Sequence, residues 1–524
     1  MMKFTKSRWL AGISTILVVY VLPPSRAHAT NRPRYGGTLR VELRAASVSL
    51  DPREWKSGSL AESDDSKLAA RVFDRLVTLD DFGRFQPALA SEWTHDSAWK
   101  SWQFKLRPGT RFSDGTPLTA ADVATALESL LPPGFQVNAN EAGINIRATR
   151  SLPDLLEQLA SGRYFIFRAL PGGKLLGTGP FYVGESIPAT PSEGNPAVLH
   201  AARMKFHANE QSWAGRPFVD TVEVTLGEPP LRQLLDLQMG KADLVEVAPD
   251  LVRKARQDNL HVWSSAPNTL LALRFDEAQA AGADERLREA VALALDRDTM
   301  ANVLLQRQAE PASALLPQWL SGYAFLFESS LNLERAKQIR AELPANEASA
   351  AEPLRLRVDA VGDLMKLLGE RVAVNVRQAN LTVQLVSHAA ATAGAGVPSS
   401  SNTPPVGLHL FAWHYDSLSP SAELGALVKQ LHLQETPETL PGFNEIEQRY
   451  TEEGQLLLAR RVLPLVVMPE YVGLSANLRN WMPARWGEWR LADVWLEQAE
   501  NPPAGPDAVS PRNSAGVQMP GVRP

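Results

Sequence analysis

Trp413 and Asp416 lie at the end of the segment LHLFAWHYD (408–416) and are well suited to ligand chemistry. A buried carboxylate that faces an ammonium group makes a charge-assisted contact, and an aromatic face beside it favours cations. A structural interpretation is also open, in which Trp413 belongs to the core and Asp416 caps a short helix from Ser417 through Leu424. The residue pattern alone does not decide between the two.

Other chemistries lack the residues that they need. The histidines form no His-x3-His or His-x4-Glu cluster, and His409 and His414 fall on opposite faces of one strand, which argues against a metal site. No G-x-S-x-G elbow surrounds a serine. The glycines around Gly177 complete neither a dinucleotide fingerprint nor a P-loop, and a glycine turn into a strand is the favoured interpretation. We therefore expect no catalytic residue, no metal and no cofactor.

The strand that ends at Trp413 belongs to an alternating pattern of strands and helices. The pattern consists of strand Leu354 to Asp359, helix Asp363 to Val376, strand Leu381 to Val386 and strand Val406 to Trp413. This alternation predicts a parallel α/β unit. The connection 388–405 is almost entirely Ala, Gly, Ser, Thr, Asn and Pro, which predicts a mobile surface loop.

A second stretch, residues 87–130, combines turns with a capped helix. Its aromatic run from Trp99 to Leu106 leads into Arg107-Pro108-Gly109, which predicts a strand that ends in a tight turn. Thr119 then stands at a helix N-cap position, with Asp122 as its capping-box partner. Apolar residues follow at helical spacing, namely Val123, Ala126, Leu127 and Leu130.

The order F-K-L-R-P-G, F-S-D-G-T-P-L-T-A-x-D-V in this stretch resembles the signature region of the family 5 extracellular solute-binding proteins. These proteins are the dipeptide, oligopeptide and nickel receptors of ABC importers. G-T-G-P-F-Y at 177–182 and R-L-R-E-A-V-A-L-A-L-D-R at 286–297 resemble further elements of the same family. The resemblance covers residues 35–490.

The resemblance implies an α/β, two-lobed periplasmic binding protein fold (type II, cluster C-like) with an extra α/β subdomain inserted in lobe one. For the whole chain we expect a signal peptide at 1–29, lobe I at 30–58, the extra subdomain at 59–176, lobe I again at 177–275, lobe II at 276–462, a return to lobe I at 463–496 and a disordered tail at 497–524. The Pro-rich composition of residues 501–524 also predicts disorder on its own.

The resemblance further implies site residues. In peptide-binding members, a tryptophan at the end of the corresponding strand lies in the cleft, and an aspartate three residues later pairs with the α-ammonium group of the ligand; Trp413 and Asp416 match this W-x-x-D. Arg274 stands where members usually have asparagine, which would place a cation near the cleft. The usual W-x-x-D-x-x-D-P pattern is broken, because Leu418-Ser419-Pro420 lacks the second aspartate.

The N-terminus predicts export. Basic residues precede the apolar run from Trp9 to Leu22, and Ala27-His28-Ala29 supplies a cleavage site, as in a secretory signal peptide. The alternative, a membrane anchor, would need roughly 20 apolar residues. Because the chain has no cysteine, neither a disulfide framework nor a lipid-modified cysteine is available, and we expect a periplasmic protein without a lipid anchor.

Removing residues 1–29 deletes four basic residues and no acids, so the formal net charge changes from −5 to −9. A mildly acidic chain is a poor binder of polyanions, and nucleic acid is not an expected partner.

The expected function is that of a monomeric binding component of an ABC importer, which takes a peptide-like ligand between two lobes and delivers it to a permease and its ATPase. The resemblance leaves other ligands open, namely a nickel chelate, a glycoside or an opine. An envelope sensor or chaperone-like module without an importer is another possibility. A secreted hydrolase is disfavoured, because it would need a nucleophile beside a base.

Overall fold

The computed structural model describes residues 33–55, 60–80, 84–141, 143–188, 190–192, 195–200, 202–276, 283–343, 353–358, 363–386, 406–433 and 445–497. The predicted signal peptide (1–29), the predicted loop 388–405 and all but the first residue of the predicted tail (497–524) lie outside these ranges.

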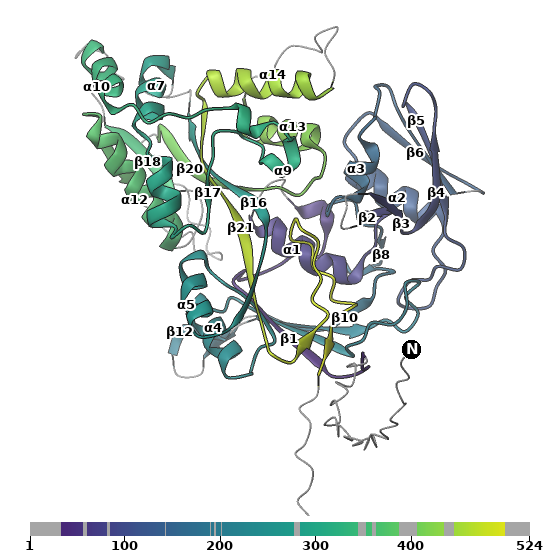
Figure 1. Ribbon diagram of the computed structural model, residues 1–524. Coiled ribbons are helices and arrows are strands. Elements are labelled where there is room, and N and C mark those ends of the chain that lie inside the picture. The colour runs from purple at the N-terminus through teal and green to yellow at the C-terminus, as the bar shows by residue number, and fades with distance from the viewer. Residues whose placement is uncertain are drawn as a thin grey trace, which may run out of the picture. The chain divides into compact units, whose positions relative to one another are not determined.

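Among the described residues, eleven strands form one hydrogen-bonded sheet (Figure 1). Its order is β10-β13-β14-β1-β15-β21-β16-β20-β18-β19, with β17 paired to β21. The strands are β1 (Thr38–Leu43), β10 (Phe181–Ile187), β13 (Ala202–Ala208), β14 (Thr221–Leu226), β15 (Leu244–Glu246), β16 (His261–Phe275), β17 (Glu310–Pro311), β18 (Leu354–Val358), β19 (Val383–Val386), β20 (Leu408–His414) and β21 (Val462–Leu474).

The predicted parallel unit is confirmed. β18 pairs in parallel with both β19 and β20, and α12 (Asp363–Gln378) connects β18 to β19. The helix buries Leu368, Val372 and Val376 at helical spacing against Leu356 and Leu410 of the strands, in a second core. Each such side chain contributes about 1.5–3 kcal/mol when fully buried.

A smaller four-stranded sheet, β4-β5-β7-β6, carries the 87–130 stretch. Its elements are β4 (Ala90–His95), β5 (Ser101–Leu106), β6 (Phe135–Asn140), β7 (Gly143–Ala148), α2 (Ala120–Leu130) and α3 (Leu155–Ala160). The predicted capping box is confirmed, because the Thr119 side chain accepts from the Asp122 backbone N–H and the Asp122 side chain accepts from that of Thr119. The prediction that Trp99 opens the strand is wrong: Trp99 has φ +55° in the turn before β5, where Asp96 accepts the Lys100 and Ser101 N–H groups.

The remaining elements surround these two sheets. The helices are η1 (Pro52–Glu54), α1 (Leu60–Val72), α4 (Pro230–Gln238), η2 (Pro249–Leu251), α5 (Val252–Gln257), α7 (Glu285–Ala294), α8 (Arg297–Thr299), the π-helical turn η3 (Met300–Leu304), α9 (Gln318–Ser321), η4 (Ala324–Leu326), α10 (Leu333–Glu342), α13 (Pro420–Gln430) and α14 (Glu445–Leu458). The short strands are β2 (Val77–Leu79), β3 (Phe85–Pro87), β8 (Arg168–Ala169), β9 (Leu175–Leu176), β11 (Thr190–Ser192), β12 (Asn195–His200), β22 (Leu478–Arg479) and β23 (Trp495–Leu496).

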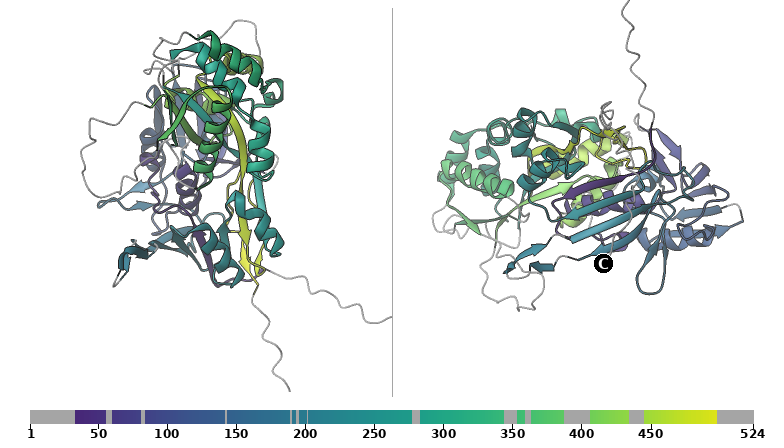
Figure 2. Two further views of the ribbon diagram at one scale, coloured as in Figure 1. Left: turned by 90° about the vertical axis from the view of Figure 1, so that its left-hand side faces the viewer. Right: turned by 90° about the horizontal axis from the view of Figure 1, so that it is seen from below.

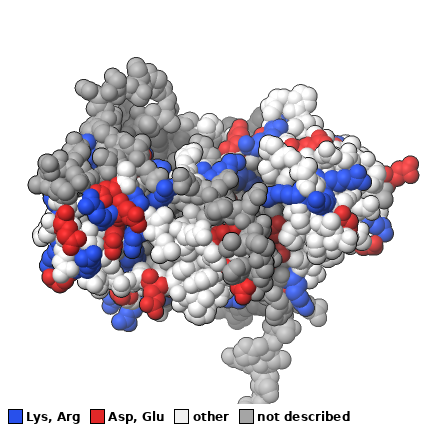
Figure 3. Space-filling view, turned by 90° about the horizontal axis from the view of Figure 1, so that it is seen from above, with Lys and Arg blue, Asp and Glu red and all other residues white. Residues whose placement is uncertain are grey.

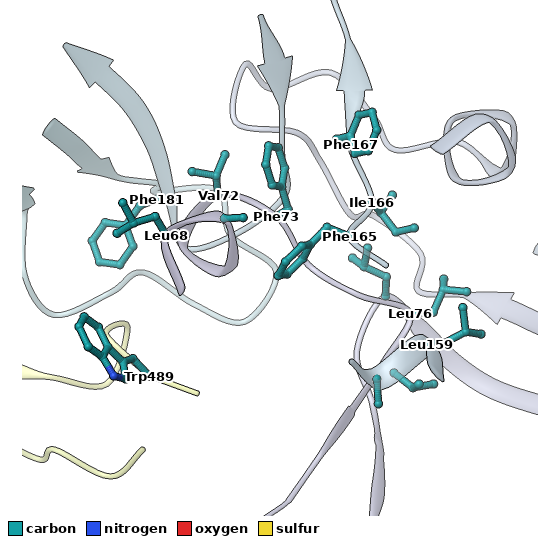
Figure 4. Close-up of a cluster of buried hydrophobic side chains, with 14 of the residues drawn as sticks. Leu68, Val72, Phe73, Leu76, Leu159, Phe165, Ile166, Phe167, Phe181 and Trp489 are labelled. Carbon is teal, nitrogen blue, oxygen red and sulfur yellow. The ribbon is translucent and has the colours of Figure 1, made fainter. Parts of the chain in front are cut away.

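Helix α1 packs in the first core, which also includes residues of the small sheet and of α3. Apolar side chains of the helix and of the residues that follow it belong to a cluster of buried hydrophobic side chains (Figure 4). The labelled members are Leu68, Val72, Phe73, Leu76, Leu159, Phe165, Ile166, Phe167, Phe181 and Trp489. Gly177 and Gly179 allow this approach, because a Cβ at Gly177 would lie 1.8 Å from the Val72 carbonyl oxygen and one at Gly179 2.7 Å from it. The two glycines are therefore structural, as predicted.

The long strands β16 and β21 run antiparallel and side by side in both Figure 1 and Figure 2. At one end Trp263 of β16 packs on the first core; at the other Leu271 and Leu273 belong to the second. The pairing shifts register between these ends, where Pro267 lies opposite Pro469. Because proline has no N–H, a normal ladder rung cannot form there. The sheet is interrupted where it passes from one core to the other.

A third core lies on the opposite face of the later part of β16. It contains Leu270, Phe411, Trp413, Leu424 and Leu427, so it joins β20 to helix α13. This core supports the end of β20, where the predicted ligand-binding residues stand.

Candidate ligand-binding pocket

A cavity of about 60 Å³ lies among the end of β20, helix α1, β21 and a loop near the C-terminus (residues 486–488), called the C-terminal loop below. The charged and polar lining includes Lys67 of α1, His414 and Asp416 at the end of β20, Glu470 of β21, and Glu488. The cavity therefore draws its lining from segments about 400 positions apart in the chain. On the face of the molecule in Figure 3, by contrast, Lys and Arg are interspersed with Asp and Glu.

Lys67 is the centre of a buried ion cluster. Its side chain is 9% exposed, and Nζ lies 2.8 Å from Oε1 of Glu470, 3.2 Å from Oδ1 of Asp64 and 3.7 Å from Oε1 of Glu246. Burial alone would lower the pKa of Lys67, but Glu470, Asp64 and Glu246 outweigh it and the pKa is raised. Lys67 is therefore charged in the folded protein.

The carboxylates around Lys67 differ in their protonation. Burial, together with Glu246, raises the pKa of Asp64 to about 7. Burial would also raise the pKa of Glu246, but Arg44, whose Nε lies 3.3 Å from Oε2 of Glu246, and Lys67 bring it down to about 2. Burial raises the pKa of Glu470, against the opposing effect of Lys67.

His414 lines the cavity as a neutral imidazole. Burial, helped by the charge of Lys67, lowers its pKa to about 3. Its Nδ1 lies 3.4 Å from the Thr269 hydroxyl of the neighbouring strand. A neutral ring can donate or accept a hydrogen bond in the cavity without adding charge.

Asp416 lies in a turn whose backbone is held by the Glu423 side chain. The Asp416 and Ser417 N–H groups donate to Oε1 of Glu423 at 2.9 Å and 2.5 Å, and the Trp413 indole N–H donates to Oε2 at 3.1 Å. Glu423 is 3% exposed, and burial together with Asp416 raises its pKa well above the usual value. The structure thus brings Trp413 and Asp416 together through a shared partner. Asp416 lines the cavity, whereas Trp413 is 2% exposed and packs in the third core.

The alternative role of Asp416 as a helix cap is wrong. The N-cap of α13 is Ser419, whose hydroxyl accepts from the Ala422 N–H at 3.1 Å, and the helix begins at Pro420. The capping hydroxyl stands three residues later than the sequence pattern suggested, and Asp416 lines the cavity instead of capping the helix.

Arg274 lies elsewhere on the same sheet. It pairs with His409 of β20, whereas the cavity end of β16 is marked by the pairing of Thr269 with His414. Five residues of strand span about 17 Å. The structure therefore does not bring Arg274 together with Trp413 and Asp416.

Sequence reasoning missed the Lys67 cluster and the C-terminal loop. Gly487 in that loop has φ +104°, and a Cβ there would lie 2.9 Å from Nδ2 of Asn268 and 3.1 Å from Oε2 of Glu470. The loop backbone therefore closes tightly over the cavity. The sequence signal near Lys67 is the helical spacing of Leu68, Val72 and Leu76, which says nothing about partners so distant in the chain.

Within the described residues, no group of three or more His, Cys, Asp or Glu side chains is placed to hold a metal ion. None of the helices in those same ranges is both long and apolar enough to span a bilayer.

Residues 84–432 match the family described as bacterial extracellular solute-binding proteins, family 5 Middle. Among curated relatives, the nickel-binding periplasmic protein of Escherichia coli is 24% identical over 344 residues, which is 60% of this chain and 65% of that protein. A Bacillus subtilis protein, YhjP, is 28% identical over 36% of this chain and 32% of its own length. The matches thus span less than two thirds of these relatives.

Solved structures show the same fold over nearly the whole chain. Haemophilus influenzae OppA, in complex with the peptide RPPGFSPFR, superposes with a TM-score of 0.71 at 16% identity, covering 88% of this chain and 99% of OppA. The murein tripeptide binding protein MppA of Escherichia coli also gives 0.71, at 18% identity, with the same coverage of 88% and 99%.

Proposed function

Because the chain belongs to family 5 of the bacterial extracellular solute-binding proteins, we propose that it binds a peptide-like solute beside Asp416 and delivers it to the permease of an ABC importer. Members of this family are non-catalytic transport components. The proposed location is the periplasm, after cleavage before Thr30; release by osmotic shock and N-terminal sequencing test this part, and a membrane-bound chain that retains Met1 would contradict it.

The observation that carries the proposal is the position of Asp416. Glu423 accepts the backbone N–H groups of Asp416 and Ser417 and so holds the turn, and the Asp416 side chain lines the cavity. A fixed carboxylate at a cavity wall is a suitable partner for an ammonium group. Two relatives supply the class of ligand: OppA of Haemophilus influenzae was solved with a nonapeptide, and MppA is named for a murein tripeptide.

The long strands β16 and β21 support closure of two lobes around the ligand. Both strands run from the first core to the second, and their pairing is interrupted at Pro267 and Pro469. Hinges are a few residues that absorb a change in backbone angles. We therefore place the hinge at this proline pair. By the proposed boundaries it lies in lobe I (177–275 and 463–496), a few residues from where the two strands meet lobe II (276–462). Small-angle scattering should show a smaller radius of gyration with ligand, and an unchanged radius at saturation would contradict closure.

The proposal is tested by removing the charge of Asp416. Asp416→Asn keeps the shape of the side chain, and loss of one partner of a buried charge pair costs on the order of 2–5 kcal/mol of binding, which is roughly 30-fold to several thousand-fold in affinity. Calorimetry with trialanine and N-acetyl-trialanine separates the ammonium contact from the rest of the peptide. Asp250→Asn is the matched control, because Asp250 is exposed in η2, away from the cavity.

We expect wild type and Asp250→Asn to bind trialanine and to discriminate against its acetylated form, and Asp416→Asn to lose that discrimination. Equal affinity for all combinations would remove Asp416 from the site.

A nickel complex is the second candidate, because the neutral ring of His414 stands in the cavity and a relative in Escherichia coli is named as a nickel-binding protein. A neutral imidazole is a good ligand for nickel. Calorimetry with nickel(II) and histidine on the same protein distinguishes the two. Binding of this mixture without binding of trialanine would replace the peptide by a metal chelate.

A further inference from the structure

A hydrogen bond links the turn after Asp416 to a different hydrophobic core. The Ser419 hydroxyl donates to Oδ2 of Asp154 at 2.9 Å, across 265 positions of sequence. Asp154 precedes α3, whose leucines belong to the first core, whereas Ser419 precedes α13, whose leucines belong to the third. Leu418, next to Ser419, packs against the first core. The turn is thus anchored on both sides.

Ser419 uses its hydroxyl in two directions at once. The oxygen accepts the Ala422 N–H at 3.1 Å as the cap of α13, and the hydroxyl hydrogen goes to Asp154. A hydroxyl has one donor and two acceptor positions, so serine can do both. An aspartate at this position, as in the W-x-x-D-x-x-D-P pattern, could cap the helix but could not donate to Asp154. The departure from that pattern therefore has a chemical consequence.

Asp154 and Asp416 also share a neighbour. Tyr164 is half-buried at the first core, and burial raises the pKa of its hydroxyl, with contributions from both Asp154 and Asp416. The charges of both carboxylates therefore act on this side chain. Gln158, one turn along α3, donates to the same Oδ2 of Asp154 at 3.0 Å, which fixes the orientation of the acceptor.

We propose that Asp154 is a positioning residue for Asp416: by accepting the Ser419 hydroxyl, it fastens the 416–419 turn to the subdomain that carries α3. Glu423 holds the turn from the side of α13, and Asp154 holds it from the side of α3. The Asp416 carboxylate is then held in one position only when the hydrogen bonds to Glu423 and to Asp154 are both formed. The role of Asp416 itself rests on the function proposed above, but the fastening does not.

The test uses three variants that all keep a helix cap, because Asn and Asp cap about as well as Ser. Ser419→Asn can still donate to Asp154, whereas Ser419→Asp cannot and sets two carboxylates against each other. Asp154→Asn combined with Ser419→Asp restores a donor and an acceptor in reversed order. Hydrogen exchange of the backbone amides of residues 414–419, measured by mass spectrometry on the ligand-free full-length protein, reports whether the turn is held, and peptides from α2 serve as the internal control.

We expect exchange of the 414–419 amides to be about tenfold faster in Ser419→Asp, since a hydrogen bond to a charged group is lost. It should stay close to wild type in Ser419→Asn and be slowed again in the double variant. Equal exchange in Ser419→Asn and Ser419→Asp would overturn the proposal, because capping alone would then explain Ser419. Failure of the double variant to slow exchange relative to Ser419→Asp would overturn it as well.

A binding measurement separates this proposal from the proposed function. The dissociation constant for trialanine should rise about tenfold in Ser419→Asp and stay within about twofold of wild type in Ser419→Asn. If wild type binds no trialanine while the exchange pattern holds, the ligand assignment fails and the fastening of the turn by Asp154 is supported.

Discussion

Removing the buried cation at position 67 should destabilise the protein, and by an amount that depends on pH. Lys67→Met keeps much of the volume of the stem but leaves three carboxylates without the cation that now lies within 4.0 Å of each. Arg44 forms an ion pair with Glu246, and its charge acts more weakly on Asp64 and Glu470. Breaking a buried ion cluster by removing one partner typically costs about 3–5 kcal/mol, and the 9% exposure of Lys67 places it in that class.

The sign of the pH dependence follows from the carboxyl groups. The folded-state pKa values of Asp64 and Glu470 are already raised by burial, and loss of Lys67 raises them further. A carboxyl group with a raised folded pKa contributes stability at low pH, which is lost as the pH rises through that pKa. The penalty for Lys67→Met should therefore be largest near pH 8 and smaller near pH 5, where these groups bind protons in the fold.

The assay is urea unfolding of wild type and variant at both pH values. Lys105→Met is the matched control, because Lys105 and its partner Glu92 are exposed at 59% and 70%, and an exposed pair contributes at most about 1 kcal/mol. A cost for Lys67→Met no larger than that of the control near pH 8, or one that is greater near pH 5 than near pH 8, would refute the account of the cluster.

Three further outcomes are expected. Gly487→Ala should lower the unfolding free energy in urea by about 1–3 kcal/mol and weaken ligand binding, because the added Cβ meets side chains and φ is +104°. Gly425→Ala in α13, where the added Cβ would meet open space, should be neutral or stabilising. His414→Gln should remove an acid-dependent loss of stability. Because the pKa of His414 is lowered to about 3 in the fold, wild type should lose about 2 kcal/mol of unfolding free energy at pH 5 relative to neutral pH. Parallel pH profiles of the unfolding free energy for the two proteins would contradict this. Thr119→Ala should cost about 1 kcal/mol of unfolding free energy through the lost cap, and an unchanged urea midpoint would show that the capping box contributes nothing.

Local signals predicted those parts of the fold that depend on neighbours in sequence. The capping box of Thr119 and Asp122 and the alternation from β18 to β20 were foreseen because each is encoded within a few residues. Trp99 was misplaced, because a turn fixed by the Asp96 side chain overrode its strand preference. Strand β6 was missed, since the polar sequence from Phe135 to Asn140 has only one fully buried side chain.

The site was predicted only in part, for the same reason. Asp416 could be named because its chemistry and its local pattern coincide. Lys67 could not, because its partners Glu246 and Glu470 lie about 180 and 400 positions away. The anchoring of Ser419 by Asp154 is equally non-local, although the missing aspartate of the pattern marked the position.

The place of β21 in the sheet has a consequence for the order in which the chain can fold. Although β21 is among the last elements in sequence, it lies between β15 and β16 at the middle of the strand order. Until residues 462–474 have been synthesised, β15 and β16 have no partner on their inner edges, and neither the first nor the second core has its full set of residues. Contacts this distant in sequence form slowly. A chain interrupted before Val462 would expose two unpaired strand edges, which are templates for aggregation, so the whole architecture depends on completing its C-terminal tenth.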